Sequence, residues 1–341
     1  MTLAPKEIAG RDLTPKRFQR ELVEGCLPVV IRGLVADWPV VQAARGSPAR
    51  LKDYLSAFDV GGRVETYLGS PAIAGKYYYQ PDFKGFNFER RIMKLLDALQ
   101  TIVESLDRPE AQSVYVGSVP TGDSLPGFAA ANPMPLLGQG VSPRIWLGTR
   151  SNVSCHHDTF DNIACVIAGR RRFTLFAPQL IAKLYVGPID NTMAGAPVSL
   201  AASADPAQAP GDGRYPLFEE IRDQALRAEL EAGDALYLPK LWWHKVESLA
   251  PLNGLVNYWW DAFSAGPDAP YTSMLLAMIA IAERPPAERQ AWKAFFDHYV
   301  FRTHGHPLAH LPPDQHGLLG PLKPENYARI RARVMHMLRG V

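Results

Sequence analysis

Two histidines and one aspartate have the residue types and the spacing of a metal site. His156 and Asp158 are two positions apart, so on an extended strand their side chains would point to one face and that of His157 to the other. His244 would come from a distant strand. Two histidines and a carboxylate leave coordination positions open and are typical of non-haem Fe(II) oxygenases, whereas structural zinc prefers four protein ligands. We predict that His156, Asp158 and His244 bind a metal and are the catalytic residues.

The segments that carry these residues belong to a β-rich region. From residue 113 the sequence becomes a series of short β-type runs separated by glycine and proline, at 114–116, 144–147, 163–167, 172–176, 235–238 and 255–260. Several short strands with this punctuation are typical of an antiparallel sandwich or barrel. The run at 233–239 reads as a turn and a strand that would bring His244 to the site. We therefore expect a mainly β core over residues 113–262.

Helix signals precede this core in the sequence. Thr14 followed by Pro15 is a good helix start, because it joins a capping residue to a proline at the first helical position. A buried strand is expected at 27–31 and a second, amphipathic helix at 88–106. We assign residues 1–112 to a helix and strand region that packs on the barrel.

Residues 263–341 are predicted to form a C-terminal helical subdomain. Its helices would span 271–281, 287–301 and 324–338. The first of them is apolar nearly all round, so it needs a partner surface, which is either the β core or a second copy of the chain. A homodimer through these helices is one of the two arrangements we expect.

Three further segments have alternative interpretations. The stretch 187–216 is rich in proline, glycine, alanine and serine, and is either a lid over the pocket or a solvated insertion. The aromatic residues of 77–88 would either line a substrate entrance or pack in the core. Trp242 and Trp243 are read as core residues that fix the strand of His244 rather than as substrate contacts.

Composition narrows the classes of partner and compartment. The 36 basic and 34 acidic residues give a formal charge of +2, which provides no electrostatic reason to expect nucleic acid or an anionic membrane as the main partner. The 3 cysteines show no CxxC spacing, so neither a disulfide framework nor a thiolate zinc site is indicated. Neither a signal-peptide pattern at the N-terminus nor an apolar run long enough for a membrane span is found, and we expect a soluble, cytoplasmic protein.

The motifs around the three metal ligands resemble those of a known family. NVSCHHD at 152–158, GRRRFTLFAP at 169–178, GDALYLPKLWWHKVESL at 233–249 and VNYWW at 256–260 look like the cupin-like Jumonji C hydroxylases. The bacterial cupin-like proteins and the asparaginyl hydroxylase that inhibits the hypoxia-inducible factor are similar in pattern. The resemblance implies a double-stranded β-helix, or jelly roll, in which His156, Asp158 and His244 hold Fe(II) and 2-oxoglutarate is the cosubstrate.

The resemblance also implies which residues bind the cosubstrate. The family places a lysine two residues after the equivalent of Gly169, for the distal carboxylate of 2-oxoglutarate, and this chain has Arg171 there. Arginine can hold a carboxylate through two parallel hydrogen bonds but is bulkier than lysine. Tyr115, Asn162 and Asn257 match further residues of the cosubstrate pocket. The alternative is that 170–172 forms a solvated basic strand edge.

These observations favour an Fe(II)- and 2-oxoglutarate-dependent oxygenase. We expect a hydroxylase of a protein side chain or small molecule, with oxidative decarboxylation of 2-oxoglutarate. Val153 replaces a threonine that is frequent in the family, and together with Arg171 it keeps two alternatives open. One is a non-catalytic metal-binding cupin that acts as a sensor or binding module, and the other is a cupin enzyme that does not use 2-oxoglutarate. The sequence leaves the prime substrate unidentified.

Overall fold

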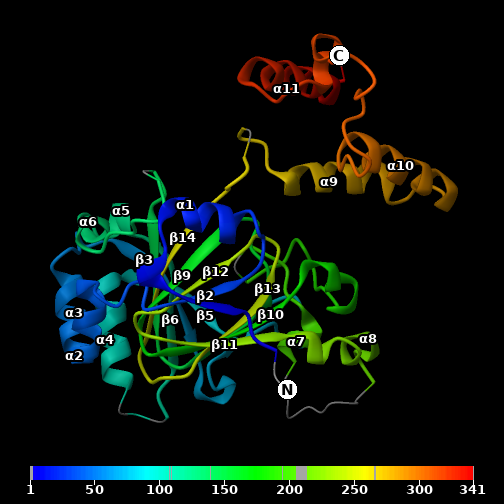
Figure 1. Cartoon of the computed structure of the whole chain (residues 1–341). Coiled ribbons are helices and arrows are strands. Elements are labelled where there is room, and N and C mark those ends of the chain that lie inside the picture. The colour runs from blue at the N-terminus through cyan, green and yellow to red at the C-terminus, as the bar shows by residue number, and fades with distance from the viewer. Residues whose placement is uncertain are drawn as a thin grey trace. The chain divides into compact units, whose positions relative to one another are not determined.

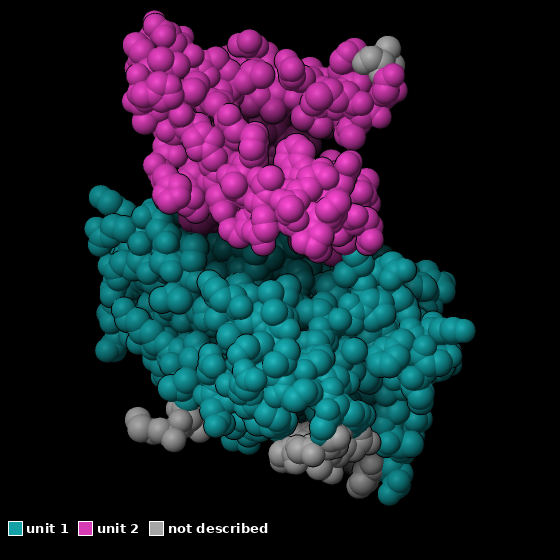
Figure 2. All heavy atoms as spheres, turned by 90° about the vertical axis from the view of Figure 1, so that its right-hand side faces the viewer, with its two compact units in different colours: residues 1–261 teal, residues 262–341 magenta. Residues whose placement is uncertain are grey.

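The chain divides into two compact units, Met1–Asp261 and Ala262–Val341, which are coloured separately in Figure 2. The computed structural model describes residues 3–106, 108, 110–138, 140–193, 195–204, 213–264 and 266–340. Residues 1–112 belong to the same unit as the β core, because their strands join its sheets.

Two sheets form the first unit (Figure 1). The larger sheet has the order β1 (Lys6–Ala9), β2 (Val29–Arg32), β12 (Ala235–Leu238), β9 (Asp161–Ala168), β14 (Asn253–Trp260), β7 (Pro143–Gly148), β6 (Ser113–Pro120), β3 (Arg63–Gly69) and β5 (Glu89–Lys94). The smaller sheet has the order β11 (Leu226–Glu231), β10 (Arg170–Phe176), β13 (Trp243–Ser248), β8 (Ser151–His156) and β4 (Lys76–Tyr77). Apart from the parallel pairs β1–β2 and β4–β8, the neighbouring strands are antiparallel.

The hydrophobic core lies between the two sheets. One buried cluster takes Val166 and Leu236 from the larger sheet and Phe173, Leu175 and Leu230 from the smaller one. Side chains that alternate along the strands of both sheets therefore meet face to face, as in a jelly roll. The predicted fold class is confirmed, and all six β-type runs of the sequence lie in strands.

Short helices cover the outer face of the larger sheet, where α2 (Pro39–Gly46) contacts β9 and α4 (Leu95–Ser105) contacts β6 (Figure 1). The first helix begins as predicted, since the Thr14 side chain accepts a hydrogen bond from the Arg17 backbone N–H. The other helical segments in the described residues of the unit are η1 (Gly10–Asp12), α1 (Pro15–Phe18), the π-helix η2 (Gln19–Val23), α3 (Pro48–Ser56), η3 (Pro71–Ile73), α5 (Thr121–Ser124), α6 (Phe128–Ala131), η4 (Pro178–Lys183), α7 (Leu200–Ser203), α8 (Pro216–Glu219) and η6 (Arg222–Gln224).

The predicted helix at 88–106 is wrong in its first half. Residues 89–94 form strand β5, which pairs with β3 at the edge of the larger sheet. Ile92 continues the apolar spacing of the helix in sequence, yet 54% of its surface is exposed. The pairing of β5 with β3 therefore outweighs the local periodicity, and the charged residues of 89–91 suit an edge strand.

The second unit is helical. It contains α9 (Pro270–Ile281), α10 (Pro286–Tyr299), η7 (Pro313–Gln315), η8 (Gly317–Leu319) and α11 (Pro324–Leu338), which match the three helices expected there. No helix in the described part of the chain is long and apolar enough to span a membrane. The predicted homodimer and the cytoplasmic location stay predictions.

Candidate active site

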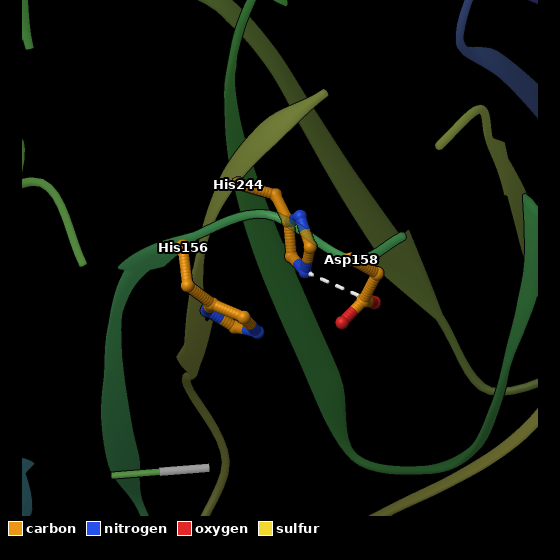
Figure 3. Close-up of side chains that lie close together, drawn as sticks. All are labelled: His156, Asp158 and His244. Atoms are coloured by element: carbon orange, nitrogen blue, oxygen red, sulfur yellow. Dashed lines mark ion pairs between the residues drawn. The ribbon is translucent and has the colours of Figure 1, made fainter. Parts of the chain in front are cut away.

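Strands β8 and β13 bring the three predicted metal ligands together. The two strands pair so that His156 and His244 are directly opposite each other (Figure 3). Asp158 follows β8, and its carbonyl accepts a 2.8 Å hydrogen bond from the Leu241 backbone N–H just before β13. One ligand atom from each of the three residues lies within 4.8 Å of the others. The motif and its distant partner therefore meet because β13 returns beside β8.

Backbone carbonyls fix the orientation of both imidazole rings. His156 Nδ1 lies 2.8 Å from the Ser154 carbonyl oxygen, and His244 Nδ1 lies 3.0 Å from the Trp242 carbonyl oxygen. A carbonyl only accepts hydrogen bonds, so Nδ1 carries the proton in each ring. The lone pair of Nε2 is then available to a metal, an arrangement that is usual for metal-binding histidines.

The electrostatic environment keeps His244 neutral. Burial, reinforced by the nearby His156, lowers the pKa of His244 to about 4, although Asp158 opposes this change. The closest approach between His244 Nε2 and an Asp158 carboxylate oxygen is 3.7 Å. A metal requires a neutral imidazole, so these two side chains match the donor set of a divalent metal. Among the described residues, these three form the only group of three or more histidine, cysteine or acidic side chains that lie close enough together to hold a metal ion.

The neighbours of the ligands pack behind the site. His157 points away from the cavity, as predicted, and its ring packs against that of Trp243 at 4.7 Å between centroids. Trp242 belongs to the core between the sheets, and Trp243 belongs to a second buried cluster with Cys155. The prediction that both tryptophans are core residues is confirmed.

A cavity of about 420 Å³ opens beside the three ligands. All four predicted cosubstrate residues line it: Tyr115, Asn162, Arg171 and Asn257. Val153 also lines it, at the position of the family threonine. The structure thus collects every predicted site residue around one space, although their roles in binding stay predictions.

Strand alternation separates the three consecutive arginines of β10. Arg170 and Arg172 are on the outer face, where both approach the Glu229 carboxylate, at 3.9 and 2.7 Å. Arg171 is on the inner face and is only 2% exposed. The interpretation of 170–172 as a solvated strand edge therefore holds for the outer two residues and not for Arg171.

Arg171 is a buried cation whose bonding is incomplete. Its Nε has no hydrogen-bond partner among the described residues, and its neighbour in the cavity is the Tyr115 hydroxyl. Burial lowers the pKa of Arg171 and raises that of Tyr115, and the contact between the two groups opposes both changes. A buried charge is costly unless it is paired. The cavity is therefore suited to an anion that accepts hydrogen bonds from Arg171 and Tyr115.

The rim combines charged side chains that the sequence did not single out with aromatic side chains, some of which belong to the predicted run at 77–88. Glu65 and Arg90 line the cavity with side chains 42% and 39% exposed, and their charged groups are 3.9 Å apart. The Arg90 guanidinium lies over the rings of Phe86 and Tyr67, at 4.9 and 5.4 Å from their centroids. Tyr77 and Phe88 line the cavity, so part of the aromatic run is at the site.

Several described residues of the segment 187–216 form part of the cavity wall. Met193 and Val198 line it, and the Met193 carbonyl accepts a 2.6 Å hydrogen bond from Arg90 Nη2. Val198 forms a bridge with His156, and the Ser199 N–H donates to the Cys155 carbonyl at 2.7 Å. Residues 194 and 205–212 of this segment lie outside the described residues.

Sequence reasoning missed the rim because it missed strand β3. The burial pattern of 63–69 alternates, which places Glu65 and Tyr67 on one face. Strand β7 has the same alternation, because Trp146 lies between the buried Ile145 and Leu147. A period of two within these runs could have indicated which face each residue occupies.

Comparison with known families is consistent with this geometry. A model of the cupin-like domain family matches residues 15–266, so the chain belongs to that family. Together with the relatives below, this confirms the resemblance to the Jumonji C group. The enzymes of this group use Fe(II) and 2-oxoglutarate, and the triad of this chain is compatible with iron.

Two relatives align along most of the chain. The human bifunctional peptidase and (3S)-lysyl hydroxylase JMJD7 is 27% identical over 270 residues, which are 73% of this chain and 81% of that protein. The mouse tRNA wybutosine-synthesizing protein 5 is 25% identical over 266 residues, which are 70% of this chain and 72% of that protein. The lysine-specific demethylase JMJ31 of Arabidopsis thaliana is 30% identical over 122 residues, and the chain covers only 21% of its length. The names of these relatives support an enzymatic role.

Proposed function

We propose that this chain is an Fe(II)- and 2-oxoglutarate-dependent oxygenase that hydroxylates a protein side chain or a small molecule. The observation that carries the proposal is the presence, in one cavity, of an open triad of metal donors and a buried arginine whose Nε has no hydrogen-bond partner among the described residues. The triad suits the metal, and the arginine suits a dicarboxylic cosubstrate that binds beside it.

The overall reaction balances without any further reductant. One substrate C–H bond, one dioxygen and one 2-oxoglutarate give one C–OH bond, one succinate and one carbon dioxide. When bound by His156, Asp158 and His244, Fe(II) would supply the redox chemistry that couples the decarboxylation to the hydroxylation.

The chain's own residues hold and orient the reactants. Arg171 and Tyr115 would donate hydrogen bonds to the distal carboxylate of 2-oxoglutarate, and the two packed sheets would exclude water around it. The Nδ1–H bonds to the carbonyls of Ser154 and Trp242 would keep Nε2 of both histidines directed at the metal.

The prime substrate would reach the site past the rim of Glu65, Arg90 and the aromatic rings. The name of JMJD7 includes a lysyl hydroxylase activity, which supports a protein side chain as the substrate here. The name of the mouse relative points to a tRNA nucleoside in that protein. The formal charge of +2 makes nucleic acid the weaker proposal for this chain.

Two alternatives remain as outcomes of the test. Val153, which lines the cavity without a hydroxyl group, favours a metal-binding cupin that acts as a sensor without turnover. A cupin enzyme that does not use 2-oxoglutarate is the other. Purified protein should be loaded with Fe(II), given 2-oxoglutarate and air, and assayed for succinate.

Each outcome of that assay selects one function. Oxygen-dependent succinate supports the oxygenase. A visible charge-transfer band of the iron-bound 2-oxo acid under argon, without succinate in air, would indicate the sensor. Iron binding without a band or succinate would indicate a cupin that does not use 2-oxoglutarate. The Asp158→Ala variant is the control that must lose whichever signal the wild type gives.

A further inference from the structure

A chain of side-chain hydrogen bonds crosses three neighbouring strands on the cavity side of the larger sheet. Trp146 on β7 donates from Nε1 to Asn257 Oδ1 on β14, at 2.7 Å. Asn257 Nδ2 donates to Asn162 Oδ1 on β9, at 3.2 Å. All three side chains line the cavity, and β14 lies between β7 and β9 in the sheet. The indole is thus linked to Asn162 through one amide.

The chemistry of the indole fixes the direction of this chain. An indole N–H can only donate, so the atom of Asn257 that faces it must be the oxygen. The amide nitrogen of Asn257 is then the atom that faces Asn162, and a nitrogen donor requires the oxygen of Asn162. The Nδ2 group of Asn162 is consequently the one left over, and it has no hydrogen-bond partner among the described residues.

We propose that Trp146 is a positioning residue that sets the polarity of the cavity through this pair of amides. Because Trp146 is a donor, Asn162 presents an N–H donor, rather than a carbonyl acceptor, to a bound ligand. The cavity then offers donors from Asn162, Arg171 and Tyr115, a set that selects an anionic carboxylate or 2-oxo acid. This inference rests on the proposed function and adds a determinant of which cosubstrate class binds.

Both amides are buried, so their orientation affects ligand binding. Asn257 is 1% exposed and Asn162 is 6% exposed, so little water is present to compensate a reversed amide. Without the Trp146 N–H donor, the amides of Asn257 and Asn162 could both rotate by half a turn and keep the hydrogen bond between them. Asn162 Oδ1 would then face the cavity and repel a carboxylate, because both groups only accept hydrogen bonds.

A double-mutant cycle separates this role from simple packing. The Trp146 ring lies 5.8 Å from that of Trp259 and 6.1 Å from that of Tyr115, and Trp146→Phe retains an aromatic ring there while removing the N–H. The cycle combines Trp146→Phe with Asn162→Ala. The measurement is the dissociation constant of 2-oxoglutarate from the Fe(II)-loaded protein under argon, with iron affinity and thermal unfolding measured in parallel.

The expected result is non-additive. Trp146→Phe alone should weaken 2-oxoglutarate binding about threefold to tenfold, and Asn162→Ala about tenfold, the loss expected for a hydrogen bond to a charged group. In the Asn162→Ala background, Trp146→Phe should have no further effect, because Trp146 acts through Asn162. Equal losses in both backgrounds would show that Trp146 only packs against the ligand, and would overturn the proposal.

A second variant, Asn257→Asp, should reverse the orientation of the Asn162 amide instead of leaving it able to rotate. In Asn257→Asp, one carboxylate oxygen still accepts a hydrogen bond from Trp146. The other carboxylate oxygen faces Asn162 and would turn the Asn162 oxygen toward the cavity. This variant should bind 2-oxoglutarate more weakly than Trp146→Phe does, and most of that loss should vanish in the Asn162→Ala background. A loss that persists there would come from the added charge alone and would count against the proposal.

The cycle also distinguishes failure of the inference from failure of the proposed function. Additive losses in a protein that binds 2-oxoglutarate overturn only the role of Trp146. A wild type that binds iron but no 2-oxoglutarate overturns both. If Trp146→Phe does not fold, the Asn257→Asp cycle gives the same decision.

Discussion

The two parts of the cavity differ in how their side chains are held. At the metal end, backbone carbonyls orient His156 and His244, and Arg171 is 2% exposed. At the rim, Glu65 and Arg90 are about two-fifths exposed, and their contacts include an ion pair of 3.9 Å and one bond from Arg90 to the Met193 carbonyl. An exposed ion pair of this kind contributes roughly 0–1 kcal/mol. The backbone therefore fixes the orientation of the two histidines, whereas the exposed side chains of the rim are held less rigidly.

Consecutive residues of β10 show the same contrast within one strand. Arg171 and Arg172 differ by one step of the β pleat, yet the first is buried beside Tyr115 and the second pairs with Glu229 in solvent. Substitutions at matched positions can therefore test the difference between the two environments directly.

The largest effect is expected at the metal end. His244→Ala removes a ligand and should lower iron affinity by more than about 100-fold, since loss of a residue that only supports a ligand already costs about 10–100-fold. His157→Ala is the control, because this neighbour faces Trp243 instead of the cavity. Iron affinity can be followed by competition with a chelator. Similar affinities in the two variants would contradict the assignment of His244.

Next in size is the loss of the buried cation. Arg171→Met should weaken 2-oxoglutarate binding about 100-fold, because two charge-assisted hydrogen bonds are lost, and should leave iron binding unchanged. Arg172→Met removes an exposed arginine that pairs with Glu229 and should change 2-oxoglutarate affinity less than about twofold. Calorimetric titration of both variants decides the matter. Equal affinities in the two would remove Arg171 from the cosubstrate site.

The smallest effect is expected at the rim. Arg90→Met removes the hydrogen bond to the Met193 carbonyl, so amide hydrogen exchange in 187–193 should accelerate by about tenfold or less, while 2-oxoglutarate affinity stays the same. Arg91→Met is the matched control, since Arg91 pairs only with the exposed Glu89 among the described residues. If Arg90→Met weakened 2-oxoglutarate binding as much as Arg171→Met, the proposed separation of the two parts would be wrong.

The same contrast explains how much of the molecule could be predicted from sequence. The triad could be located from its residue types and spacing, whereas Arg171, Tyr115, Asn162 and Asn257 could be located only through the resemblance to a known family. Strand β5 could not be predicted, because its pairing with β3 is a long-range contact that overrides local periodicity. Arg90 lies on β5, so its place at the rim could not be predicted for the same reason.

The row of hydrogen bonds from Trp146 to Asn162 could not be predicted from the sequence either. It joins β7, β14 and β9, whose order in the sheet only the folded structure reveals. The asparagines at 162 and 257 could be assigned to the cosubstrate pocket by resemblance. The direction of their hydrogen bonds requires the position of the indole N–H.

We propose that the triad and Arg171 act on one ligand in one cavity. The most direct test is an anaerobic titration of the Fe(II)-loaded protein with 2-oxoglutarate, followed by the visible charge-transfer band of a chelated 2-oxo acid. We predict a saturable band in the wild type, no band in His156→Ala, and a band in Arg171→Met only at much higher 2-oxoglutarate concentration. Absence of the band in the wild type, or its retention in His156→Ala, would contradict the account.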